Sequence, residues 1–208
     1  MYELYYGAGA CSMSVHVALE ELGAEYKAIA VDMKNNEHKS DWYLDINPRG
    51  QVGTLKTPDG IVTENAAMIV YLNDKHKGDL IPANGYNRAL ALQWLMFANS
   101  SLHPAYGGVM AAKTHGVADD TIKKLCDTVQ KKWDLIEDQL SKSGGPFLMG
   151  EHFGPGDIYS TVCANWTFLP HLPTFGPKTN AFLETVVARA SFQKVMEKEG
   201  VQHFANKG

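Results

Sequence analysis

The chain has 208 residues, of which 45% are hydrophobic and 20% charged, and its formal net charge is −4. This length suits one large domain or two small ones with a sizeable core. The slightly acidic balance argues against a broad nucleic-acid-binding surface, and no apolar run approaches the ~18 residues that a membrane helix needs.

Residues 1–78 combine strand and helix patterns. A strand, a helix, a strand, a loop with an irregular helix, a hairpin and a closing helix are expected at 2–6, 12–23, 25–32, 33–46, 54–63 and 64–78. The hairpin is indicated by the turn signal Pro58-Asp59-Gly60. A βαβ unit followed by a hairpin and a helix predicts a mixed sheet with helices on its faces.

From about residue 88 onward the strand signals stop. Helical patterns are found instead, at 87–102, 121–140, 157–169 and 180–190. The third of these is apolar almost all round and predicts a buried central helix. We therefore expect an α/β domain at 1–78 and an all-helical domain at 88–208, joined by a linker at 79–87 that contains proline and glycine.

Cys11 lies after a glycine-rich turn, between the first strand and the first helix. Free N–H groups and the positive end of the helix dipole point at this position, so the pattern predicts a lowered pKa for the Cys11 thiol. Ser14 stands where a dithiol oxidoreductase needs its second cysteine, which disfavours dithiol exchange. The alternative interpretation is a small packing residue at a tight corner.

Other cofactor patterns are weak. The segment 7–12 approaches a dinucleotide-binding fingerprint, but Ser12 stands where a third Gly or Ala is needed. Eight histidines and three cysteines show no metal-ligand spacing, so we expect no metal site. The scattered cysteines and the absence of a signal-peptide pattern predict reduced thiols and a cytoplasmic location.

Two further segments could bind a peptide-like ligand. In the segment 47–55, glycines flank Gln51 and Val52, whose backbone could pair with an extended peptide. Glu64 and Asn65 open the helix after the hairpin, where Glu64 could hold an amine and the helix start a carboxylate. A loop that enters a strand and an ordinary helix cap are the alternative interpretations.

These segments together resemble the cytosolic glutathione transferases, in particular the bacterial beta class with an active-site cysteine. Five segments occur in the family's order and at its spacing, and they begin at Leu4, Ile46, Thr63, Leu92 and Phe147. The resemblance implies a thioredoxin-like N-terminal domain and an all-α C-terminal domain. It also implies a homodimer and a glutathione site between the two domains.

The family's site residues map onto positions of this sequence. Cys11 matches the active-site cysteine, and His103 matches a histidine that faces it. The positions expected to bind the rest of glutathione are Gln51, Val52, Gly53, Glu64 and Asn65. Asp157 matches a structural aspartate that binds the backbone of the turn before its helix, although Gly154 replaces the usual Ser or Thr cap.

Gly53 stands where the family has a cis proline. Because a cis peptide without proline costs about 3 kcal/mol, the sequence predicts a trans or else strained Val52–Gly53 peptide. Pro104, next to His103, predicts a kink in the first helix of the second half.

We expect a glutathione transferase that adds the glutathione thiolate to small apolar electrophiles. Cys11 also suggests a mixed disulfide with glutathione and thiol exchange, and the choice between the two reactions stays open. The candidates for the wall of the electrophile pocket are Tyr106, Met110, Trp166 and Phe168. The alternative function is a catalytically weak relative that uses the fold for protein interaction.

Overall fold

The computed structural model describes residues 1–166, 169–171 and 173–206. Its N-terminal half contains a four-stranded sheet in the order β2-β1-β3-β4. The strands are β1 (Tyr2–Tyr6), β2 (Tyr26–Ala30), β3 (Thr54–Thr57) and β4 (Gly60–Thr63). Strand β1 pairs parallel with β2 and antiparallel with β3, and β3 and β4 form an antiparallel hairpin. The predicted mixed sheet is confirmed.

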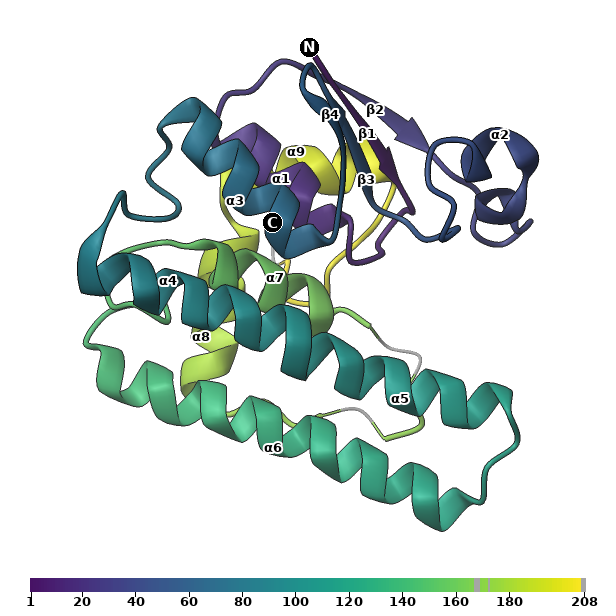
Figure 1. Cartoon of the computed structure of the whole chain (residues 1–208). Helices are drawn as coiled ribbons and strands as arrows, with labels where there is room; N and C mark the ends of the chain where they lie inside the picture. Colours follow the sequence, from purple (N-terminus) through teal and green to yellow (C-terminus); the bar gives the residue numbers. More distant parts are fainter. Residues whose placement is uncertain (167–168, 172, 207–208) are drawn as a thin grey trace.

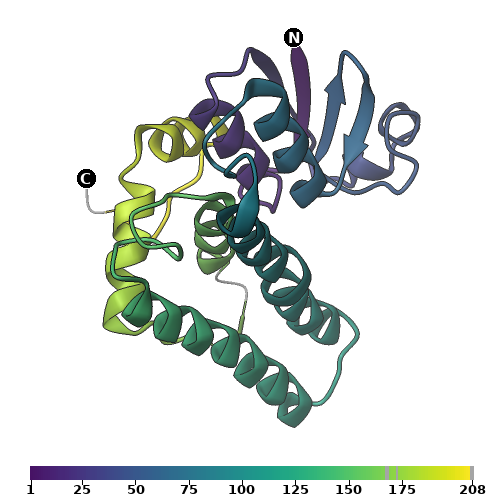
Figure 2. The ribbon, with the colours of Figure 1, turned by 60° about the vertical axis from the view of Figure 1, so that its left-hand side comes forward.

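Helices cover both faces of this sheet (Figures 1 and 2). They are α1 (Met13–Glu21), η1 (Glu37–Lys39), α2 (Asp41–Leu44) and α3 (Asn65–His76). Successive residues of a strand point to opposite faces, so β1 needs apolar side chains in both directions. Leu4 and Tyr6 join the main core with α1 and α3, whereas Tyr5 packs with Val31 and with Tyr43 of α2.

The described part of the chain after residue 84 is built from helices. They are α4 (Gly85–Phe97), η2 (Ala98–Leu102), α5 (His103–Thr114), α6 (Asp119–Ser143), α7 (Pro155–Ala164), α8 (Pro177–Val187) and α9 (Ala190–Glu199). Helix α7 is buried along its whole length, which confirms the predicted central helix, although it ends at Ala164 and not at residue 169. Helices α5 and α6 run side by side below the sheet half (Figure 1).

The predicted kink is a change of helix type. The chain passes through a π-helical turn, η2, before α5 begins at His103. Pro104 has no N–H to donate to a carbonyl four residues earlier, so the regular ladder is interrupted there.

Helix α9 was not predicted from the sequence. Its buried side chains Phe192, Val195 and Met196 lie on one face, and the helix packs against α1 of the sheet half. The predicted helical patterns end at residue 190, although Phe192, Val195 and Met196 recur at helical spacing.

None of the helices in the described part of the chain is both long and apolar enough to cross a bilayer. The division into two domains at residues 79–87 stays a prediction.

Candidate functional site

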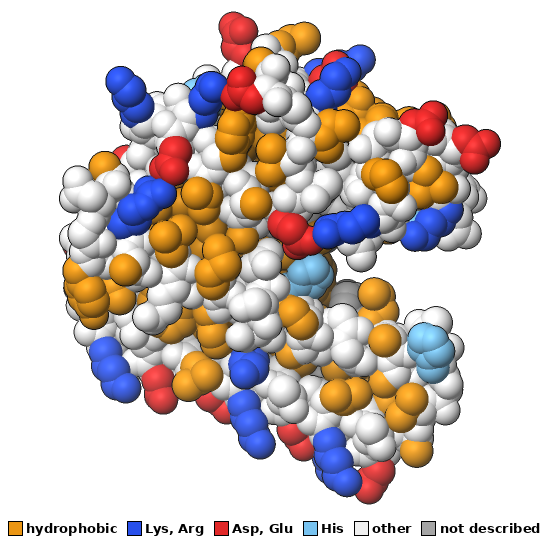
Figure 3. All heavy atoms as spheres, in the orientation of Figure 1, with side chains coloured by type: hydrophobic (Ala, Val, Ile, Leu, Met, Phe, Trp, Pro, Cys, Tyr) orange, Lys and Arg blue, Asp and Glu red, His pale blue; other side chains and the backbone are white. Residues whose placement is uncertain are grey.

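A cleft of about 850 Å³ lies between the loops of the sheet half and helices α5 and α7. Figure 3 shows it as a deep notch between the upper and lower parts of the molecule. The predicted site residues that line it are Cys11, Gln51, Val52, Gly53, Glu64, Asn65, His103, Met110 and Trp166. The fold therefore brings together segments that lie more than 150 residues apart in the sequence.

Cys11 occupies the turn between β1 and α1. Ser12 holds this turn closed, because its Oγ accepts the Gly7 N–H at 3.1 Å. The Cys11 Sγ lies 3.8 Å from the Val52 carbonyl oxygen, to which its S–H can donate. The thiol is thus placed against the loop that was predicted to pair with a peptide-like ligand.

Burial raises the pKa of the Cys11 thiol, which corrects the prediction of a lowered pKa. The Asn65 side chain and the backbone N–H groups of Ser12 and Cys11 favour the thiolate and offset part of this rise. The prediction counted the N–H groups at the helix start, but not the desolvation of the thiol in the folded cleft.

We expect the alkylation rate of Cys11 by iodoacetamide to rise with a midpoint above the ordinary thiol pKa of about 8.5, because the thiolate is disfavoured by burial. The rate is measured over a pH series by mass spectrometry of the Cys11 peptide. The buried Cys126 and Cys163 should react more slowly in the same digest. A midpoint at or below the ordinary value would contradict the raised pKa.

Two side chains hold the loop 47–53 in place by hydrogen bonds to its backbone. The Gln51 carbonyl accepts the Tyr43 hydroxyl at 2.7 Å and the Asn47 side-chain amide at 2.8 Å. The N–H of Val52 has no hydrogen-bond partner among the described residues. The loop therefore presents an unpaired backbone donor on a rigid support at the cleft.

Two glycines of this loop are enclosed. Gly50 has a φ of +57°, and a Cβ there would lie 2.8 Å from the His38 carbonyl oxygen. A Cβ at Gly53 would lie 2.8 Å from the Cβ of Ser12. The turn that carries Cys11 thus packs directly against Gly53.

The Val52–Gly53 peptide is cis, so the trans form, the first of the two predicted alternatives, is wrong. That prediction rested on the general rarity of cis peptides without proline. Such a rule contains nothing about how this loop packs against its neighbours.

Glu64 and Asn65 stand at the start of α3. Glu64 is exposed and forms an ion pair with Arg49, a residue of the loop on the same cleft. Asn65 is buried, and its side-chain amide donates to the Tyr159 hydroxyl at 3.1 Å. One carboxylate and one amide donor therefore stand beside the free N–H groups of a helix start.

His103 and Tyr159 form a pair on the other wall. The Tyr159 hydroxyl lies 2.8 Å from Nδ1 of His103. Asn65 can only donate to the Tyr159 oxygen, so the phenolic hydrogen is available for His103 Nδ1. Burial lowers the pKa of His103 and keeps the ring neutral near pH 7. Because Nδ1 of His103 accepts this hydrogen bond, the single hydrogen of the neutral ring is assigned to Nε2.

Four residues were predicted to line the pocket for the electrophile, and the structure places only some of them at the cleft. Met110 and Trp166 line the cleft. Tyr106 does not, which corrects the prediction: it is fully buried and accepts the Trp133 Nε1–H at 2.9 Å. Tyr106 and Met110 lie one turn apart on the same side of α5, but the ring of Tyr106 packs against Trp166, with 5.4 Å between the ring centroids, and sequence spacing does not show this contact. Phe168 lies outside the described residues.

Asp157 lies away from the cleft and binds backbone. Its carboxylate accepts the N–H groups of Leu148 at 2.9 Å and Gly154 at 2.7 Å. Both bonds are buried, so Asp157 ties the turn before α7 to the start of that helix. This geometry is that of the structural role inferred from the sequence.

Tyr159 was missed by sequence reasoning. It belongs to the helix pattern that is apolar all round, and such a pattern does not reveal which face meets a cleft. Arg49 was also missed, although it stands within the singled-out segment 47–55. Within the described residues, no group of three or more His, Cys, Asp or Glu side chains could hold a metal ion.

Comparison with known proteins identifies relatives of this architecture. Residues 2–74 match the family described as the glutathione S-transferase N-terminal domain. The chain is 27% identical to glutathione S-transferase GstA of Escherichia coli O157:H7 over 205 residues, which cover 96% of this chain and all of that protein.

Two solved structures are similar over nearly the whole length. One is a ternary complex of BphK, a bacterial glutathione transferase, at 31% identity and a TM-score of 0.84, covering 96% of this chain and 100% of that chain. The other is a glutathione transferase homologue from Sulfitobacter with bound glutathione, at 28% identity and a TM-score of 0.81, covering 97% and 99%.

Proposed function

The chain belongs to the glutathione S-transferase family and is a transferase, and from this premise we propose that its cleft binds glutathione beside Cys11. The Sulfitobacter homologue, which shares the fold over nearly its whole length, was solved with glutathione bound.

One observation supports this proposal most directly. A thiol, an unpaired backbone N–H and a carboxylate–amide pair line one cleft, at Cys11, Val52 and Glu64–Asn65. Glutathione carries a thiol, a peptide backbone and an α-amino acid group. Each cleft feature is complementary to one of these three groups.

His103 can serve the sulfur as a hydrogen-bond donor. Its Nδ1 accepts the Tyr159 hydroxyl, so the neutral ring offers the hydrogen on Nε2. A donor of this kind stabilises a thiolate without removing its proton. The raised pKa of Cys11 makes the S–H of Cys11 a second donor near neutral pH.

Two reactions fit this arrangement. In conjugation, the glutathione thiolate attacks an electrophilic carbon and forms a C–S bond, while the leaving group departs or a proton is taken up. In exchange, the Cys11 thiolate attacks the glutathione sulfur of a mixed disulfide, and the released thiolate takes a proton. A second glutathione then attacks the Cys11–glutathione disulfide, which gives glutathione disulfide and restores Cys11.

The second substrate is proposed to enter past the helical wall. Met110 and Trp166 supply apolar surface there, which favours small apolar electrophiles. A homodimer in the cytoplasm is part of the proposal and is supported by the family resemblance.

Calorimetric titration of the protein with glutathione tests the proposal. We expect saturable binding, weakened at least about tenfold in Glu64→Gln, because the amide cannot pair with the ligand's ammonium group as a carboxylate does. Glu151→Gln removes another exposed carboxylate and should bind as the wild type does. No heat of binding up to about 10 mM glutathione would overturn the proposal.

A further inference from the structure

The peptide of Gly9, in the loop that leads to Cys11, is held from two sides. Its N–H donates to Glu199 Oε2 at 2.9 Å, and its carbonyl accepts the Trp166 Nε1–H at 2.9 Å. Both partners come from the helical half of the chain, 190 and 157 residues away. Gly9 itself has a φ of +66°, a conformation that glycine adopts without steric cost.

The second oxygen of Glu199 binds His16 in the middle of α1. Glu199 Oε1 lies 2.7 Å from His16 Nδ1, and both side chains are completely buried. His16 Nε2 has no hydrogen-bond partner among the described residues. Placing the hydrogen on Nδ1 therefore satisfies the carboxylate and leaves no buried N–H unpaired.

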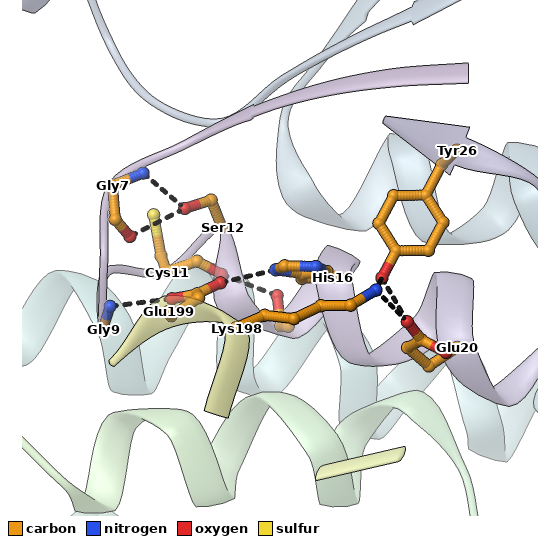
Figure 4. A network of polar contacts seen from close by, with 10 residues as sticks. Gly7, Gly9, Cys11, Ser12, His16, Glu20, Tyr26, Lys198 and Glu199 are labelled. Atoms are coloured by element: carbon orange, nitrogen blue, oxygen red, sulfur yellow. Dashed lines mark hydrogen bonds and ion pairs between the residues drawn. The ribbon is translucent and has the colours of Figure 1, made fainter. Parts of the chain in front are cut away.

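Figure 4 shows that Glu199 links the loop before Cys11 to the helix after it. The Glu199 carboxylate lies between the Gly9 backbone and the His16 ring, so it joins residues two positions before and five positions after Cys11. The ring of His16 is itself packed against Tyr6 and Tyr26, with 5.3 Å between the ring centroids in each case. A rigid buried carboxylate thus sets the spacing between the loop and the helix.

Other carboxylates at this interface have different partners. Glu21 forms a two-bond ion pair with Arg189, at 2.7 and 2.8 Å. Glu20 pairs with Lys194 and Lys198 at 2.7 Å each. These contacts join α1 to the α9 end of the chain without reaching the loop. They therefore provide attachment between the halves that does not depend on Glu199.

We propose that Glu199 is a positioning residue that, with Trp166, fixes the Gly9 peptide and so holds the Cys11 thiol at the floor of the cleft. The inference rests on the proposed function only in treating Cys11 as the working thiol. When the Gly9 backbone is released, we expect the loop to move away from the loop of Val52 and the partly buried Cys11 thiol to become more accessible to solvent.

The alkylation rate of Cys11 by iodoacetamide near pH 7.5 tests this inference without glutathione. We expect Glu199→Ala to raise the rate roughly tenfold, because the loop loses its buried anchor and the thiol its enclosure. Glu199→Gln keeps an oxygen for the Gly9 N–H, so the loop keeps its anchor and the rate should stay within about threefold of wild type. Its amide donates to His16 Nδ1 when the ring hydrogen moves to Nε2, which has no partner among the described residues, so the melting temperature should fall. A purely structural role would not give this recovery by the conservative variant.

Glu21→Ala is the matched control, since it removes an interface carboxylate of α1 that does not contact the loop. Its Cys11 rate should stay within about twofold of wild type even where its melting temperature falls. An unchanged rate in Glu199→Ala, or an equal rise in Glu21→Ala, would overturn the inference.

Two further outcomes are informative. If Glu199→Ala does not fold, Trp166→Phe removes the other bond to Gly9 while keeping most of the ring, and it should raise the rate in the same direction. No rise in Trp166→Phe would then contradict the inference. If the wild type fails to bind glutathione but Glu199→Ala still alkylates faster, the positioning role stands and the proposed function falls.

Discussion

Cys11→Ala is expected to lose glutathione-dependent thiol exchange by a factor of at least about 1,000, because the variant lacks the sulfur that forms the mixed disulfide. Conjugation should fall by no more than about tenfold. In that reaction the nucleophile is the sulfur of glutathione itself, and Cys11 contributes only a hydrogen bond from its S–H. Both rates are measured on the same protein preparation, with a model disulfide and a small aryl halide as second substrates.

Cys126→Ala is the matched control for this experiment. It removes a buried cysteine of α6 that lies outside the cleft, and both rates should stay near wild type. Exchange that survives in Cys11→Ala would show that the thiol does not form the intermediate. A conjugation rate that falls as steeply as exchange would instead place Cys11 in both reactions.

Asp157→Ala is expected to destabilise the protein by about 2–4 kcal/mol, which corresponds to a fall in melting temperature of roughly 5–15 °C. The substitution leaves the N–H groups of Leu148 and Gly154 buried without their carboxylate acceptor. Thermal and urea unfolding followed by circular dichroism measures the loss. Asp138→Ala, at an exposed position of α6, should change the melting temperature little.

The stability difference should also depend on pH. Burial raises the pKa of Asp157 to about 7 in the folded protein, although the hydrogen bonds from the Leu148 and Gly154 N–H groups lower this pKa. The same carboxyl titrates at about pH 4 in the unfolded chain. At pH values between about 4 and about 7, the folded state therefore binds one proton more than the unfolded state. The advantage of wild type over Asp157→Ala is therefore larger at pH 6 and narrows by roughly 1 kcal/mol by pH 8. An advantage that grows with pH would contradict the raised pKa.

Local sequence signals located much of the site. The strand–turn–helix pattern put Cys11 at a helix start, and the hairpin put Glu64 and Asn65 at another. Both are short-range features, because a turn and a helix start are specified by neighbouring residues. Their convergence on one cleft follows from the strand order of the sheet, whereas the βαβ-plus-hairpin pattern predicted only that the sheet is mixed.

Two properties of the site could not be obtained in this way. The pKa of Cys11 depends on how deeply the folded cleft encloses the thiol, and its sign was predicted wrongly. The tyrosine at the cleft is Tyr159 and not Tyr106, because Tyr106 is fully buried against Trp166 and Trp133. Periodicity specifies that a helix is buried, but a helix that is apolar all round has no preferred outward face.

By itself, then, the sequence determined which local elements form and which residues stand at their ends, since these depend on backbone preferences and on the spacing of apolar side chains. The tertiary structure decided what surrounds each group: the burial of Cys11, the hydrogen bond that orients His103, and the contact of Glu199 with Gly9. Desolvation and hydrogen bonding act through space between segments as many as 190 residues apart, and the spacing of residues along the chain does not encode them.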